Sequence, residues 1–206
     1  MGNGIPNHHC RIVLTGGPGG GKTTAADLMR REVGERIVVV PEAATMLFAG
    51  GFPRHGELHA RRSIQQAIYH VQRNLEDIHA ALYPERILLC DRGTLDSVVY
   101  WPEQGDDDFY HALNTTFEAE IGRYDAVLFF ETAAVGNLAI EGGNPARTES
   151  IQEAVTLDRR LQAVWARHPN YCFIPHEKSF FGKLQSGLSK LVELLNGRGL
   201  GQEENG

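Results

Sequence analysis

The sequence predicts an α/β domain of three layers, with a five-stranded parallel sheet between two layers of helices. Short, continuously apolar runs rich in valine, isoleucine and leucine alternate along the chain with longer segments of helical periodicity. Such runs are typical of parallel strands that are buried on both faces. In addition, a glycine-rich segment joins the first apolar run directly to the first helical segment. This alternation favours crossover connections that place helices on both faces of one sheet.

The strands and helices can be assigned in order along the chain. The predicted strands cover residues 12–14, 36–40, 86–90, 125–130 and 171–174. The predicted helices cover residues 23–33, 43–48, 57–82, 94–99, 109–121, 148–167 and 180–195. Gly34 stops the first helix and Pro84 closes the third, whose apolar residues recur at helical spacing. Thr148 or Ser150 is the candidate N-cap of the helix over 148–167.

The remaining segments are predicted to be connections and termini. Residues 102–108 form an acidic loop, and the glycine-rich residues 142–145 form a mobile loop. One domain is expected over residues 10–195, preceded by a flexible N-terminus, 1–9, and followed by a disordered tail, 196–206. A single domain suits a chain of 206 residues.

Composition narrows the class of protein. With 20 basic and 26 acidic residues the net charge is −6, so the chain lacks the basic footprint of a nucleic-acid-binding protein. No apolar run approaches the roughly 18–20 residues of a membrane span, and the start lacks the apolar core of a signal peptide. The three cysteines are odd in number, and Cys90 and Cys172 fall in predicted strands. We therefore expect reduced thiols and a cytoplasmic protein.

The segment from Arg11 to Thr24, RIVLTGGPGGGKTT, fits the phosphate-binding pattern G-x-x-x-x-G-K-[ST] between a strand and a helix. A flexible glycine-rich turn is the alternative, and the strand and helix around the segment disfavour it. Lys22 is expected to bridge the β- and γ-phosphates, and the Thr23 hydroxyl to ligate Mg²⁺. The residues expected to hold the phosphates are Gly16, Gly17, Pro18, Gly19, Gly20, Gly21, Lys22, Thr23 and Thr24. No N-K-x-D guanine-reading segment is present, so ATP is the expected nucleotide and GTP the alternative.

Three acidic residues, Glu42, Asp91 and Glu131, stand just beyond predicted strands, at the edge of the sheet where ligands bind in such folds. Asp91 follows four apolar residues in a Walker B arrangement and is a candidate ligand of Mg²⁺, or else a helix cap. Arg92 is a candidate phosphate contact, or a salt-bridge partner. Glu42 is placed to orient an acceptor hydroxyl and take its proton, or to offset the dipole of the helix over 43–48. Arg147 follows the glycine-rich loop and is either a lid arginine or an exposed one.

Four stretches give the chain a family resemblance: TGGPGGGKTT, VVVPEAA, LLCDRGTLDSVVY and NPARTESIQEAVTLDRRLQAVWARHP. The chain resembles the small AAA-type ATPase domains that include the nicotinamide riboside kinase-like domain and the TRPL translocation defect protein. The resemblance implies a P-loop fold close to nucleoside and nucleotide kinases. It implies that Glu42 is the general base and that Asp91 and Arg92 act at the phosphates. In deoxynucleoside kinases a proline follows the base glutamate, whereas in this chain Pro41 precedes Glu42. The lid region offers chiefly Arg147, with Arg159 and Arg160 a few turns further on, which favours an uncharged acceptor over a phosphorylated one.

Two functions follow as hypotheses. The first is a Mg²⁺-dependent kinase that transfers the γ-phosphoryl group of ATP to a small hydroxyl-bearing molecule such as a nucleoside. The second is a nucleotide-dependent regulatory binding module without kinase activity. A kinase needs a second cavity between Glu42 and the long helix over 57–82, near Arg61, Arg62, Gln65 and Gln66, whereas a module does not. The sequence leaves the acceptor and the oligomeric state open.

Overall fold

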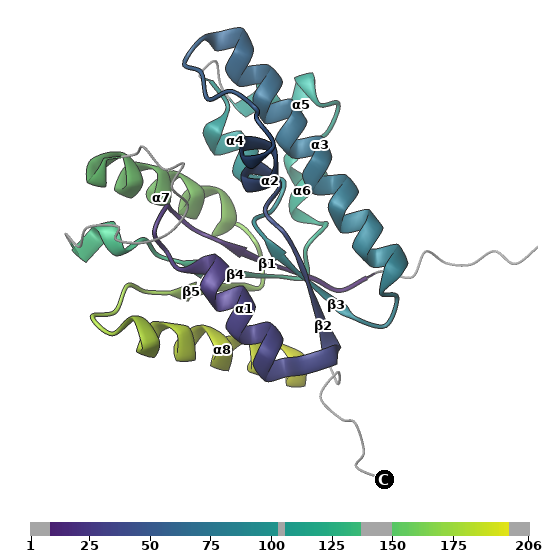
Figure 1. The fold of residues 1–206 in the computed structure, drawn as a ribbon, viewed down its shortest axis with the longest axis vertical. Coiled ribbons are helices and arrows are strands. Elements are labelled where there is room, and N and C mark those ends of the chain that lie inside the picture. The colour runs from purple at the N-terminus through teal and green to yellow at the C-terminus, as the bar shows by residue number, and fades with distance from the viewer. Residues whose placement is uncertain (1–8, 103–105, 137–149, 198–206) are drawn as a thin grey trace, which may run out of the picture.

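The computed structural model describes residues 9–102, 106–136 and 150–197. Within these residues it confirms the predicted α/β fold, with five parallel strands in the order β2-β3-β1-β4-β5 (Figure 1). The strands are β1 (Arg11–Thr15), β2 (Ile37–Val40), β3 (Ile87–Asp91), β4 (Ala126–Phe130) and β5 (Tyr171–Ile174). In the centre of the sheet Val13 is in register with Cys90 of β3 and with Val127 of β4.

Helices cover both faces of this sheet (Figure 1). They are α1 (Lys22–Val33), α2 (Ala43–Ala49), α3 (Leu58–Leu82), α4 (Asp96–Tyr100), α5 (Asp106–Ala112), α6 (Phe117–Ile121), α7 (Ile151–Trp165) and α8 (Phe180–Gly197). Two short 3₁₀ turns, η1 (Gly34–Arg36) and η2 (Ala133–Gly136), complete the described elements. None of the described helices is both long and apolar enough to cross a membrane.

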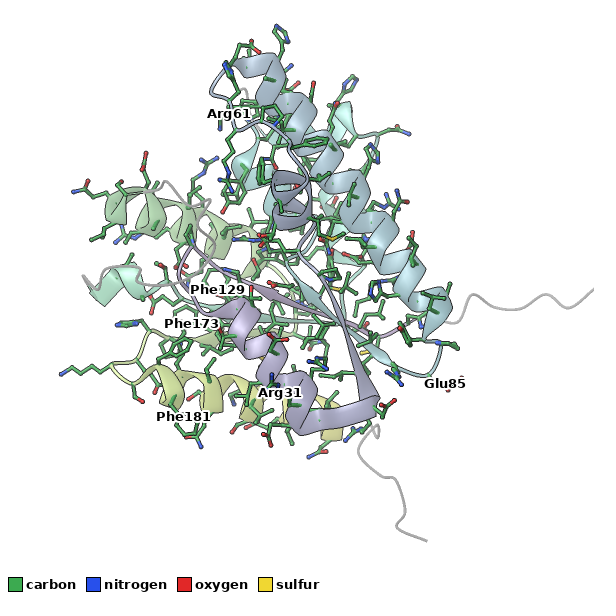
Figure 2. The ribbon with its side chains drawn as sticks, viewed as in Figure 1. Arg31, Arg61, Glu85, Phe129, Phe173 and Phe181 are labelled. Atoms are coloured by element: carbon green, nitrogen blue, oxygen red, sulfur yellow. The ribbon has the colours of Figure 1, made fainter. Side chains whose placement is uncertain are left out.

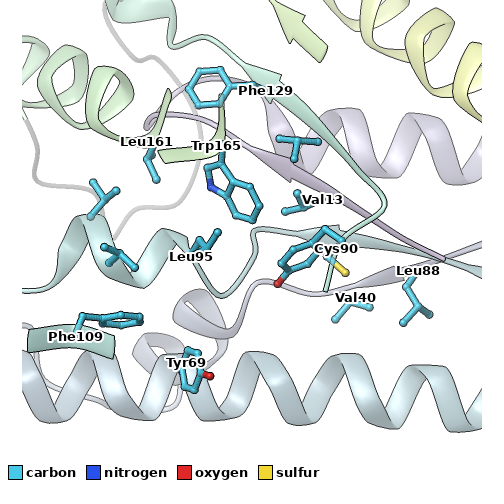
Figure 3. Packing of buried hydrophobic residues seen from close by; sticks show 14 of the residues in the cluster. Val13, Val40, Tyr69, Leu88, Cys90, Leu95, Phe109, Phe129, Leu161 and Trp165 are labelled. Atoms are coloured by element: carbon cyan, nitrogen blue, oxygen red, sulfur yellow. The ribbon is translucent and has the colours of Figure 1, made fainter. Parts of the chain in front are cut away.

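The two faces of the sheet have separate hydrophobic cores because successive strand residues point to opposite sides. Ile12 and Leu14 pack with Met29 of α1 and Leu191 of α8. Val13, between them in sequence, joins the other core, which α3, α4 and α7 cover (Figure 3). Cys90, Tyr69, Phe129 and Trp165 belong to that second core, and the last three side chains are fully buried. The described cysteines form no disulfide.

One predicted helix is wrong. Residues 109–121 were expected to form a single helix, but α5 ends at Ala112 and α6 begins at Phe117. Asn114 between them has a positive φ of 49°, and the Thr116 hydroxyl caps α6 by accepting from the Ala119 N–H at 3.1 Å. The expected acidic loop is also shorter than predicted, because α5 already begins at Asp106.

Other boundaries shift by a few residues. Ser150, rather than Thr148, caps α7, in a capping box completed by Glu153. Thr148 and the expected mobile loop 142–145 lie outside the described residues, as do most of the expected terminal segments. The long helix agrees with the prediction, and Glu57 caps it by accepting from the His59 and Ala60 N–H groups.

Candidate active site

The glycine-rich loop connects β1 to α1 at the carboxyl edge of the sheet. Gly16 has a φ of 132°, and a Cβ there would lie 2.0 Å from the Phe130 carbonyl oxygen, so only glycine fits. Gly21, with a φ of 87°, is the N-cap of α1 and supplies no side-chain cap. The N–H groups of the first turn of α1 therefore lack a side-chain acceptor from the cap, and the positive end of the helix dipole is directed toward the loop. Such a terminus is suited to an anion.

Lys22 is folded onto the loop that precedes it. Its Nζ donates to the carbonyl oxygens of Gly16 at 2.8 Å and Gly17 at 2.9 Å. The side chain is buried, and burial together with the positive charge of Arg92 lowers the pKa of Lys22 to about 7. A charged phosphate is a stronger acceptor than these neutral carbonyls. Lys22 is thus positioned to transfer its hydrogen bonds to an anion in the loop.

Thr23 and Asp91 meet beside the loop, as the sequence predicts. The Thr23 hydroxyl donates to Asp91 Oδ2 at 2.8 Å. The other carboxylate oxygen, Oδ1, is buried and has no hydrogen-bond partner in the described part of the chain. Burial, with the negative charge of Glu42, raises the pKa of Asp91. A buried carboxylate oxygen without a partner beside a hydroxyl is a pair of hard oxygen donors, the type that Mg²⁺ prefers.

Glu42 lies directly after β2 and faces Arg92 across the site. Arg92 Nε donates to Glu42 Oε1, and the Thr45 hydroxyl donates to Oε2 at 2.6 Å. Burial acts to raise the pKa of Glu42, but Arg92, Thr45 and Lys22 outweigh it, so the pKa lies below its usual value. Glu42 is therefore ionised at neutral pH.

Arg92 is held between two acids from different elements. In addition to Glu42, its Nη1 donates to Asp96 Oδ2 of α4 at 2.8 Å. Arg92 has a left-handed φ of 74°, rare for a residue with a side chain. Its backbone is bonded on both sides: its N–H donates to the Leu14 carbonyl at 2.9 Å, and its carbonyl accepts from Gln72 Nε2 at 3.2 Å. This fixed turn directs the guanidinium into the site.

A pocket of about 410 Å³ opens between Glu42 and α3. It begins at Pro18 of the glycine-rich loop and runs past Glu42, Arg92 and Asp96. Apolar side chains line its middle, including Phe48, Ile64 and Ile68, together with Tyr100. The other lining residues of α3 are Arg61, Gln65 and Gln72; Arg62 and Gln66 do not line it. The side chain of Gln65 has no hydrogen-bond partner within the described residues, so its amide is available to a ligand.

Three polar residues that the sequence analysis missed support the loop from behind. Asp158 Oδ1 accepts from the Gly17 N–H at 2.7 Å and from the Thr132 N–H at 3.0 Å. Thr132 in turn donates to the Pro18 carbonyl, and Lys183 Nζ donates to the Gly20 carbonyl at 2.8 Å. Asp158 could have been recognised from the sequence as a buried acid, because it lies on the apolar face of α7, three residues before Leu161.

The other residues singled out from the sequence lie away from this cluster or outside the described residues. Arg147, the candidate lid arginine, lies outside them. Arg159 and Arg160 are exposed on α7. Glu131 directly follows β4, but its Oε2 accepts from the His176 N–H at 2.7 Å. Asp108 accepts from Arg62 and from the Trp101 indole N–H.

The fold and the loop define a P-loop nucleotide-binding domain. Residues 11–180 match the model of a family described as AAA domain, and the chain belongs to that family. This confirms the resemblance predicted from the sequence. A search of curated proteins found no match to the chain.

Solved structures share the fold at low sequence identity. The deoxyadenosine kinase of M. mycoides with bound dATP is 12% identical, with a TM-score of 0.59 over 88% of this chain and 98% of that chain. The same kinase with the products dCMP and a flexible dCDP is 13% identical, with a TM-score of 0.58 over 91% and 99%. The NadR protein in complex with NAD and AMP-PNP is 13% identical, with a TM-score of 0.58 over 90% of this chain. This chain spans about half of NadR, 49% of its length. The chain thus resembles nucleoside kinases in fold.

Proposed function

We propose that this protein is a Mg²⁺-dependent kinase that transfers the γ-phosphoryl group of ATP to a hydroxyl-bearing small molecule such as a nucleoside. The observation that carries the proposal is the pocket between Glu42 and α3. It shares Pro18 with the phosphate loop, so a molecule in the pocket would lie beside a nucleotide in the loop. Phosphoryl transfer depends chiefly on such positioning of two reactants.

The phosphate loop would hold the triphosphate through backbone N–H groups from Gly16 to Thr24. Lys22 would exchange its carbonyl partners for phosphate oxygens and remain charged there. Asp158, Thr132 and Lys183 act only through the backbone of the loop, so they would position it without contacting the nucleotide.

Mg²⁺ fits the pair formed by Thr23 and Asp91. Within the described residues no group of three or more His, Cys, Asp or Glu side chains is gathered to hold a metal. Two protein oxygens completed by phosphate and water oxygens are the usual magnesium arrangement in triphosphate sites. When bound, the ion would neutralise charge on the phosphates. The buried Asp91 Oδ1 would gain a partner, and Thr23 would offer its hydroxyl oxygen.

Glu42 and Arg92 would act on the acceptor side. Glu42 is ionised and lines the pocket, so it can accept the hydrogen bond of an acceptor hydroxyl and then its proton. Arg92 uses Nε and Nη1 on the two acids, which leaves Nη2 for a phosphate oxygen. Asp96 would keep Arg92 in place when Glu42 turns to the acceptor.

Thermal unfolding with two ligands tests the proposal. ATP and GTP, each with Mg²⁺, are scanned alone and with nucleosides and vitamin precursors. A ligand that binds the folded state raises its stability in proportion to ln(1 + [L]/Kd), so a bound acceptor adds its own shift. We expect additive shifts followed by ADP release. Shifts from nucleotide alone across the whole panel, with no ADP release, would favour the regulatory binding module instead.

A further inference from the structure

The acceptor pocket carries opposite charges at its two ends. Its acids, Glu42 and Asp96, lie at the inner end, and both are paired with Arg92. Its other charged lining residues are Arg54 and Arg61. With His55 neutral, the three arginines and two acids leave the lining at +1, in a chain whose net charge is −6.

Neither outer arginine is neutralised by an acid in the described part of the chain. The Arg54 guanidinium lies 4.1 Å from the centre of the Phe48 ring. Within the described residues Arg61 uses one donor, in a 3.3 Å hydrogen bond from Nη2 to the Tyr100 carbonyl. A guanidinium has five N–H donors, so most of those on Arg61 remain available.

Two described acids close in sequence to these arginines or to their neighbours are already engaged. Glu57 directs both carboxylate oxygens to the His59 and Ala60 N–H groups. Asp108 is paired with Arg62, which does not line the pocket. Two cations beside a partly apolar cavity therefore lack a counter-charge within the described residues.

The pocket also has a direction set by α3. Arg61, Ile64, Ile68 and Gln72 follow one another at helical spacing along its pocket face. Eleven residues at the rise of an α-helix place the Cα atoms of Arg61 and Gln72 roughly 16 Å apart. Arg61 lies at the N-terminal end of α3, away from the sheet (Figure 2), whereas Gln72 bonds the Arg92 carbonyl at the inner end.

We propose that the acceptor is an elongated anion. It presents its hydroxyl to Glu42, an apolar or aromatic body to Phe48, Ile64 and Ile68, and a carboxylate or phosphate group to Arg54 and Arg61. This inference rests on the proposed function, because the same pocket supplies the acceptor. An anionic acceptor replaces the uncharged acceptor that the few arginines of the lid region favour. Paired arginines recognise either group through charge-assisted hydrogen bonds.

Matched pairs of probes test the inference on the full chain saturated with ADP and Mg²⁺. Nicotinamide riboside against nicotinic acid riboside reports a carboxylate, and pyridoxine against pyridoxine phosphate reports a phosphate. We expect the member of a pair that carries the added carboxylate or phosphate group to bind roughly tenfold or more tightly than the member without it. The arm that shows the preference identifies the anionic group. The inference is overturned if no probe that carries a carboxylate or phosphate binds more tightly than its partner without that group, or if no probe binds at all.

The double variant Arg54→Gln, Arg61→Gln should abolish the difference between the members of a pair. The matched control is Arg31→Gln, which removes an exposed charge on α1, away from the pocket (Figure 2), and should leave the preference unchanged. A preference that survives in the double variant overturns the inference.

Transfer is measured separately with ATP, so the two proposals fail in different ways. Anion selectivity without any phosphorylated product would support the anion-binding pocket and rule out the kinase. Equal phosphorylation of the two members of each pair, unaffected by the double variant, would support the kinase and overturn the inference that the acceptor carries an anionic group.

Discussion

Glu42 is the residue on which the proposed chemistry depends most directly. Arg92 and Thr45 hold its carboxylate at the pocket wall and keep it ionised. A low pKa is compatible with its role, because proton transfer from the acceptor is a late, assisting step in a loose phosphoryl-transfer transition state. In the proposed reaction Glu42 would orient the acceptor hydroxyl as well as remove its proton.

The Glu42→Gln variant should separate binding from transfer. The amide keeps the size of the side chain but cannot take a proton, so acceptor phosphorylation should fall by about 10²–10⁴-fold. The dissociation constant for ATP should change little, because the loop contacts remain. Calorimetry measures binding, and product formation measures transfer. Glu32→Gln, at an exposed position of α1, is the control. Phosphoryl transfer at the wild-type rate in Glu42→Gln would rule out Glu42 as the general base.

Lys22 should link nucleotide binding to pH. Its pKa is about 7 in the free protein, so part of the population is neutral at neutral pH and most of it above. Phosphate oxygens favour the charged amine and raise its pKa in the complex. Above about pH 7 the complex therefore holds more protons than the free protein. The affinity for ATP should fall as the pH rises from the pKa of Lys22 in the free protein to its higher pKa in the complex. Calorimetry at about pH 8, in two buffers of different ionisation enthalpy, should show proton uptake. Identical heats in the two buffers would contradict this account.

At the scale of elements, periodicity predicts long helices well and short ones poorly. The α3 prediction agrees because an unbroken apolar stripe is bounded by the Glu57 cap and Pro84. The stripe over 109–121 misleads because Phe109, Leu113, Phe117 and Ile121 keep a spacing of four residues across the break. The break arises where the Thr116 hydroxyl offers the backbone a new cap, a local choice that hydrophobic spacing cannot reveal.

The contact between α7 and the phosphate loop should depend on one oxygen of Asp158. Asp158→Ala removes the acceptor of two buried N–H groups and should lower the free energy of unfolding by about 1–3 kcal/mol. It should also weaken ATP binding, because the loop loses its support at Gly17. Asp158→Asn keeps an acceptor oxygen at this position, so it should lose clearly less stability and clearly less affinity for ATP. Denaturant unfolding and ATP titration measure the two effects. Equal losses in the two variants would show that the charge, and not the acceptor, matters.

The packing of α8 on the sheet should depend on the absence of a side chain at Gly187. A Cβ there would lie 2.5 Å from the fully buried ring of Phe130. Gly187→Ala should therefore overpack the core and lower the free energy of unfolding by about 1–3 kcal/mol. Gly197→Ala, at the end of the same helix with nothing within 4 Å of the added Cβ, should leave it unchanged or slightly raised. Equal stability of the two variants would contradict the packing described for α8.

For the whole molecule, the sequence predicts the sheet and the side of the sheet that carries the site. Strand-loop-helix order fixes the fold, and the carboxyl ends of parallel strands bring Lys22, Thr23, Glu42, Asp91 and Arg92 together. Asp96 pairs with Arg92 at a local spacing of four residues, whereas its hydrogen bond to Thr15 joins residues 81 positions apart. Asp158 was not found because its partner, Gly17, is 141 residues away. No local pattern contains such a pairing, since helix packing creates it.

The pocket is likewise a property of the folded chain. Its walls come from residues 18, 42–56, 61–72 and 92–100, which are separate along the sequence. From the sequence, a kinase is expected to have a cavity between Glu42 and the long helix. The volume, and the arginines that have no acidic partner among the described residues, arise only when α2, α3 and α4 are brought together. Figure 1 shows the placement of these three helices.

The most direct test of the kinase follows the γ-phosphoryl group itself. The full chain is incubated with Mg²⁺, ATP labelled on the γ-phosphate and each member of the acceptor panel, and the label is traced by mass spectrometry. We predict that the label passes to one acceptor class in step with ADP formation, and that Glu42→Gln abolishes the passage. Label that stays in ATP, or appears only as inorganic phosphate across the panel while ATP binds normally, would contradict the kinase.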